Sequence, residues 1–146
     1  MSEPQFSREN IYAALFALVG ASAPFVTKTR RIREYSDVDQ SLQPALLQVE
    51  LGENWEAPVG KPPLVTLQCR LLLYCESNDP VSPVSTQMNG LLDAVMGALA
   101  WTQWQNYRQT LGGLVSHARI AGEITIAEGL SGQSEAIVPV EILVNA

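Results

Sequence analysis

The sequence predicts an α+β fold in which two helices pack on one face of a mostly antiparallel β-sheet, in the order α-β-β-β-α-β-β. Two segments, 7–20 and 83–99, carry apolar residues at helical spacing. Five others are extended or alternate between apolar and polar residues, which is typical of strands with one buried face. With 146 residues, 47% of them hydrophobic and 16% charged, the chain fits a single domain, 1–146, with a substantial core.

The first half of the chain begins with a helix and continues with strands. Ser7 is a suitable N-cap for a helix that ends near Gly20. The segment 25–35 is rich in β-branched residues and predicts a first strand, and 45–51 predicts a second. A long loop rich in Gly and Pro, 52–63, follows.

The segment 64–76, LVTLQCRLLLYCE, gives the clearest strand prediction. Cys69 and Cys75 lie on its apolar face. Six residues of strand separate them by ~20 Å, whereas a disulfide needs Cα atoms within ~7 Å. We therefore expect two reduced core thiols, as in a protein assembled in a reducing cytoplasm.

The second half of the chain predicts a helix followed by a β-hairpin. Gly90 and Gly97 lower the helix propensity of the second predicted helix, and they could instead allow close approach to the sheet. Two alternating stretches, 114–128 and 135–144, predict the hairpin. Because Pro139 cannot donate a ladder hydrogen bond, the last strand is expected to be an edge strand or to contain a bulge.

The sequence shows no arrangement of residues typical of catalysis, and we expect neither enzyme activity, a cofactor nor a metal. His117 is the single histidine, and it falls inside a predicted strand, where a surface or interface role is the usual one. It is also the only candidate base for a cysteine nucleophile. The apolar run near the N-terminus has an acidic flank, unlike a secretory signal, and is too short to cross a bilayer. We therefore expect no membrane partner.

Charge is distributed unevenly along this chain of net charge −6. Lys28, Arg30, Arg31 and Arg33 fall within six positions, although the chain has only nine basic residues. The net charge disfavours general binding to DNA or to an anionic membrane. If 25–35 is extended, Lys28 and Arg30 share one face while Arg31 and Arg33 share the other. This placement suits an edge strand that meets the carboxylates of a partner, and equally a solvated edge strand protected against aggregation by its charges.

A second distinctive segment contains Trp101, Trp104 and Tyr107, followed by Arg108. These side chains could stack on single-stranded bases. They could also close the hydrophobic end of the second helix over the core, or anchor a protein interface. The acidic composition favours the core or the interface interpretation.

The chain resembles the tail terminator proteins of long-tailed bacteriophages, also called tail completion or minor tail protein U-like proteins. The resemblance rests on five segments in series: SRENIYAALFALV, VTKTRRIREYSDV, QPALLQVE, QTLGGLVSHARIAGEI and AIVPVEILV. It runs through nearly the whole chain, but 52–63 and 101–110 match no motif of the family. It implies an α+β domain that forms a homohexameric ring, caps the tail tube, ends tube polymerisation and provides the surface on which the head connector docks.

The resemblance also implies a location and partners. The protein would assemble in the bacterial host cytoplasm and reside in the tail or neck of the virion, and DNA would pass through the ring lumen only at ejection. A head-to-tail ring joins two different surfaces, which can attract each other by opposite charge. The four basic residues would form one surface. Candidates for the other are Asp37, Asp39, Glu50, Glu53 and Glu56.

Three questions stay open at the level of sequence. The loops 52–63 and 36–44 are candidates for the contact with the tail tube, because long loops often carry function. Another head-tail connector or neck protein is an alternative within the structural proteins. A small nucleic-acid-binding module that uses the basic stretch with Trp101 and Trp104 is an alternative from another class.

Overall fold

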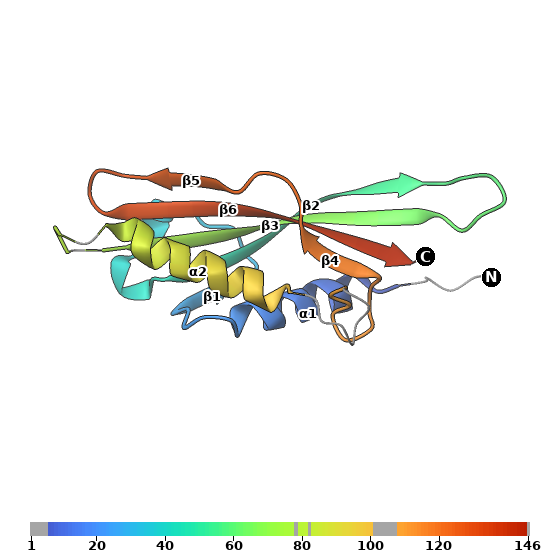
Figure 1. The fold of residues 1–146 in the computed structure, drawn as a ribbon, viewed down its shortest axis with the longest axis horizontal. Helices are drawn as coiled ribbons and strands as arrows, with labels where there is room; N and C mark the ends of the chain where they lie inside the picture. Colours follow the sequence, from blue (N-terminus) through green and yellow to red (C-terminus); the bar gives the residue numbers. More distant parts are fainter. Residues whose placement is uncertain (1–5, 78, 82, 101–107, 146) are drawn as a thin grey trace.

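The computed structural model describes residues 6–77, 79–81, 83–100 and 108–145. In this part of the chain, two helices lie on the same face of a six-stranded sheet (Figure 1). The predicted α+β class and element order are thus confirmed. The elements are α1 (Arg8–Gly20), β1 (Thr27–Thr29), the 3-10 turns η1 (Tyr35–Asp37) and η2 (Gln40–Leu42), β2 (Ala45–Glu56), β3 (Leu64–Glu76), α2 (Val84–Ala98), β4 (His117–Ile120), β5 (Thr125–Glu128) and β6 (Gln133–Asn145).

The sheet is built around two long central strands. Its order is β1-β2-β3-β6-β4, and β5 also pairs with β6. β1 and β2 are parallel, and the remaining pairs are antiparallel. β3 and β6 stay in register from the pair Leu64–Asn145 to the pair Glu76–Gln133, so they run together along the length of the molecule (Figure 1).

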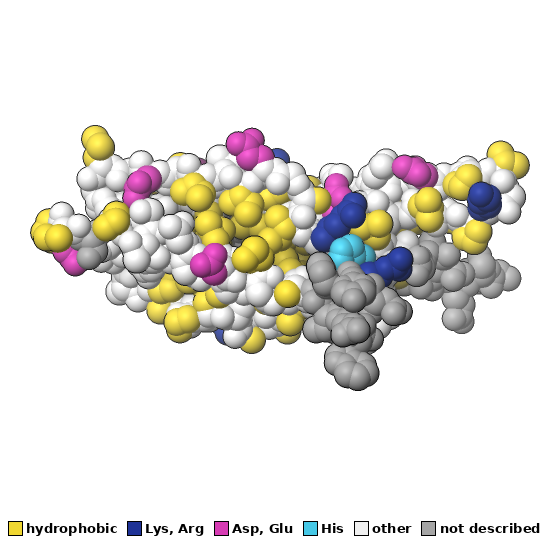
Figure 2. Space-filling view, in the orientation of Figure 1, with side chains coloured by type: hydrophobic (Ala, Val, Ile, Leu, Met, Phe, Trp, Pro, Cys, Tyr) yellow, Lys and Arg dark blue, Asp and Glu magenta, His cyan; other side chains and the backbone are white. Residues whose placement is uncertain are grey.

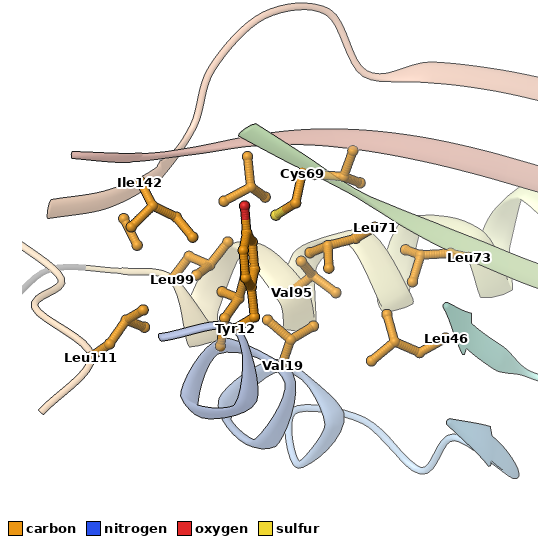
Figure 3. Packing of buried hydrophobic residues seen from close by; sticks show 14 of the residues in the cluster. Tyr12, Val19, Leu46, Cys69, Leu71, Leu73, Val95, Leu99, Leu111 and Ile142 are labelled. Atoms are coloured by element: carbon orange, nitrogen blue, oxygen red, sulfur yellow. The ribbon is translucent and has the colours of Figure 1, made fainter. Parts of the chain in front are cut away.

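The core lies between this sheet and the two helices. Ser7 caps α1 as predicted, its side chain accepting a hydrogen bond from the Asn10 backbone N–H. Both helices direct their apolar stripes at alternate residues of β3 and β6, and Figure 3 shows Tyr12 and Val19 of α1 facing this layer. The main buried side chains of the helices and of the two strands are Ile11, Leu15, Val19, Met88, Leu91, Val95, Leu67, Leu71, Leu73, Val138, Val140 and Ile142.

The cysteines behave as the strand pattern predicts. Cys69 and Cys75 are unbridged and fully buried in the helix-facing side of β3. Burial raises the pKa of Cys69 to about 12 and that of Cys75 to about 11. Both thiols therefore stay protonated at neutral pH and act as small apolar core groups.

The last strand was predicted to be an edge strand or to contain a bulge, and both alternatives were wrong: β6 is central in the sheet, and its register with β3 is unbroken. Pro139 pairs with Arg70 of β3 on one side, and on the other side its carbonyl accepts from the Ala121 N–H. A strand residue directs its N and C=O to the same edge, so the donor-free nitrogen of Pro139 faces the gap between β4 and β5. The strand predicted over 114–128 is interrupted opposite Pro139, between β4 and β5. No ladder hydrogen bond from the Pro139 nitrogen is therefore needed there.

The predicted first strand over 25–35 is much shorter than expected, because β1 contains only Thr27–Thr29. After Thr29 the chain leaves the sheet edge and covers part of the face opposite the helices. There Tyr35 and Val38 pack with Tyr74, and the two tyrosine rings meet edge to face with centroids 5.3 Å apart. Burial of these apolar side chains outweighs the strand propensity of the segment.

β2 is longer than its predicted range, 45–51, and extends through Glu56. The register with β3 shifts between Glu50 and Gly52, which marks a β-bulge at Leu51. The connecting loop is consequently 57–63 rather than 52–63. The suggestion that two helix glycines allow close approach to the sheet was also wrong, since a Cβ at Gly90 or Gly97 would meet no atom within 4 Å.

Candidate subunit interface

Arg30, which directly follows β1, joins two elements of the same chain, α1 and β2. Its guanidinium bonds to the Glu9 carboxylate of α1 and, at 2.8 Å, to the Glu50 carboxylate of β2. The side chain is only 28% exposed, and its hydrogen bond lowers the pKa of Glu9. The sequence predicts Arg30 and Glu50 on two surfaces that meet between copies. Here the two side chains pair within one chain.

A second ion pair supports the same side of β2. The Arg8 Nε lies 2.6 Å and 3.0 Å from the two oxygens of Glu53, and this bond lowers the pKa of that carboxyl. The bulge at Leu51 explains why Glu50 and Glu53 share a face despite their odd spacing. Sequence reasoning missed Arg8 and Glu9, because no local pattern shows which distant charge a helix terminus meets.

The other predicted basic residues have a different environment. Lys28, Arg31 and Arg33 are exposed, and none forms an ion pair with any residue that the structure describes. Arg31 and Arg33 follow β1 rather than belong to it, so the predicted two-faced strand does not exist. These three cations are available to a partner, whereas Arg30 stabilises the fold.

The predicted acidic residues divide in the same way. Asp37 and Asp39 are exposed in or beside the 3-10 turns, and Glu56 is exposed at the end of β2. None of these three makes an ion pair within the described part of the chain. Trp101 and Trp104 lie outside the described residues.

The end of β2, the loop and the start of β3 form a projecting hairpin, here called the arm (residues 51–64), at one end of the molecule (Figure 1). Four apolar side chains on it are exposed by half or more: Leu51 by 50%, Trp55 by 50%, Val59 fully and Leu64 by 55%. The Trp55 ring lies near that of Phe6, with 6.3 Å between the ring centroids. The arm is therefore a candidate interaction site.

A cleft of about 720 Å³ lies between the segment 32–40 and the ends of β3 and β6. The Tyr74 hydroxyl donates to the Arg33 carbonyl at 2.7 Å, which holds the segment against the sheet. Burial raises the pKa of Tyr35 to about 12, so its hydroxyl stays neutral. The residues that line this cleft are Ile32, Arg33, Glu34, Tyr35, Ser36, Val38, Asp39, Gln40, Tyr74, Glu76, Gln133 and Glu135.

A second, more apolar hollow of about 520 Å³ lies between α2 and β4, where Met96 is 59% exposed beside Ile120. Figure 2 shows a band of apolar side chains on this face, next to the histidine and two basic side chains. The Nδ1 atom of His117 accepts from the Gln109 backbone N–H at 3.1 Å. Burial, followed by the nearby Arg119 and Arg108, lowers the pKa of His117.

The described residues contain no group of three or more His, Cys, Asp or Glu side chains that could hold a metal ion. Among the described helices, none has the length and apolar character needed to cross a membrane. The sequence matches no protein-family model and no curated protein.

Proposed function

We propose that this protein is a structural virion protein, the tail terminator of a long-tailed bacteriophage. In this role it forms a homohexameric ring on the tail tube, ends tube polymerisation and presents the surface for head joining. The observation that carries the proposal is the series of five segments, spread over nearly the whole chain, that resembles this family.

The geometry supports an assembly role in three ways. The fold class is the one that the resemblance implies. Lys28, Arg31 and Arg33 are exposed without carboxylate partners in the described part of the chain. The arm carries apolar side chains that the monomer leaves in solvent. Exposed charge and exposed apolar surface on separate elements suit a subunit that binds copies of itself and other virion parts.

Electron microscopy of particles assembled without this protein tests the proposal. We expect overlong or headless tails, and we expect purified protein to bind the ends of isolated tail tubes. Tails of normal length that are joined to heads would contradict the proposal. Binding to the portal or its adaptor instead of the tube would identify a connector protein, and salt-sensitive DNA binding would favour a nucleic-acid module.

A further inference from the structure

The tip of the arm is a compact cationic element. Lys61 is the only charged residue of the loop 57–63. It is exposed, it makes no ion pair with a described residue, and its backbone N–H closes a turn on the Pro58 carbonyl. Val59 beside it is fully exposed. Three prolines in the loop restrict the backbone, which lowers the entropy lost when such a tip docks.

The cleft at the other end has the complementary character. Four carboxylates line it, those of Glu34, Asp39, Glu76 and Glu135, against the single cation Arg33. Ile32, which is 65% exposed, and the ring of Tyr35 add apolar surface. Acidic side chains beside apolar surface suit an ammonium group on an alkyl stem, together with a small apolar neighbour. The same carboxylates repel phosphate groups, so a nucleic acid does not fit.

The arm cannot reach the cleft of its own chain. The arm begins at the Leu64 end of β3 and the cleft lies at the Glu76 end, thirteen residues along one straight strand. At ~3.3 Å per residue the two ends are ~40 Å apart. Figure 1 shows the arm and the 3-10 turns at opposite ends of the long axis. Any contact between them must therefore join two copies, and a head-to-tail arrangement is the one that can build a ring.

We propose that the tip of the arm of one copy docks into the cleft of the next, with Lys61 among the cleft carboxylates and Val59 against the apolar surface. The inference rests on the proposed function for the ring, and it adds the junction from which the ring is built. It pairs the loop 52–63 with a cleft that includes part of the loop 36–44, although the sequence marked both loops for the tail tube. Because the two surfaces differ, each copy provides one arm and one cleft, and the contact repeats until the ring closes.

Charge reversal on each side of the junction tests the proposal. Sedimentation velocity at low ionic strength, where exposed charges are least screened, measures self-association of the wild type, of Lys61→Glu and of a double variant, Glu34→Lys with Glu135→Lys. Each variant should weaken association at least about tenfold, because like charges then meet. A chain that carries all three changes should regain association. Arg70→Glu is the matched control, since it reverses an exposed charge outside both surfaces.

Zero-length carbodiimide coupling of the wild type gives a second, mutation-free measurement. Mass spectrometry of the cross-linked dimer should find a peptide that joins Lys61 to a cleft carboxylate. Cross-links from Lys61 only to other carboxylates would overturn the junction. So would a wild type that stays monomeric at every concentration, or a Lys61→Glu variant that associates as well as the Arg70→Glu control.

The junction and the proposed function fail separately. If Lys61→Glu leaves association unchanged while particles without the protein have overlong tails, the junction is wrong and termination stands. If the charge changes act as expected but tails without the protein are normal, the junction stands and the terminator function is wrong.

Discussion

Gly132, immediately before β6, offers the sharpest test of the sheet geometry beside the cleft. Its φ is +81°, and a Cβ at this position would lie 2.2 Å from the Ser77 carbonyl oxygen. The Ser77 N–H donates to the Gly132 carbonyl at 2.9 Å. In Gly132→Ala, the left-handed conformation costs ~1–2 kcal/mol, and displacement of the hydrogen bond costs ~1 kcal/mol more. We expect a loss of ~2–3 kcal/mol in the free energy of unfolding, a large share of the ~5–15 kcal/mol typical of a domain.

Urea denaturation followed by circular dichroism measures this loss as a lower midpoint at unchanged slope. Gly113→Ala is the matched control, because Gly113 has φ +93° but a Cβ there would meet no atom within 4 Å. The control should lose only the conformational part, ~1–2 kcal/mol. Equal losses in the two variants, within ~0.5 kcal/mol, would refute the argument that contact with Ser77 requires glycine.

Three further outcomes follow from the same structure. Arg30→Ala and Glu50→Ala should show a coupling of ~0.5–1 kcal/mol in a double-mutant cycle of unfolding free energies, since the pair is partly exposed; a coupling of zero would contradict an intrachain bond. Gly90→Ala should raise the unfolding free energy by ~1 kcal/mol in the same assay, because this exposed helix position leaves room for a methyl group. Burial raises the pKa of Cys69 to about 12 and of Cys75 to about 11, so the folded chain holds protons that the unfolded chain releases near its ordinary thiol pKa of about 8.5. The contribution of the two thiols to the free energy of unfolding should be fully present below that pH and should decline as pH rises towards 12. Replacing both cysteines by alanine should flatten the pH dependence of the unfolding free energy.

The spacing of apolar residues correctly predicted those helices and strands that bury a single face. The helical spacing in α1 and the alternation in β3 were confirmed because each signal is local and the core lies on a single side. The bounds of β2 were wrong because a bulge at Leu51 let the strand continue beyond a Gly-rich sequence. The prediction from Pro139 failed because the feature that accommodates this proline is the gap between β4 and β5. That gap lies about eighteen residues away in the chain.

Charge was harder to interpret than hydrophobicity. The basic stretch was recognised, but its members have different roles: Arg30 is held by Glu9 and Glu50, whereas Arg31 remains in solvent. The point where the chain leaves the sheet, after Thr29, decides which basic side chain forms an ion pair within the chain. No local sequence pattern predicts that point. The cleft was missed for the same reason, since its walls come from the segment 32–40 and from the distant ends of two strands.

Because β3 and β6 pair along their full length, the molecule should resist force best along the direction of these two strands. The two strands share thirteen aligned residue pairs, flanked by β2 on one side and by β4 and β5 on the other. Tension applied parallel to the strands loads all these hydrogen bonds in shear at once, whereas a pull across them opens the ladder one rung at a time. A protein with this architecture resists stretching from end to end and yields most easily when its strands are peeled apart sideways.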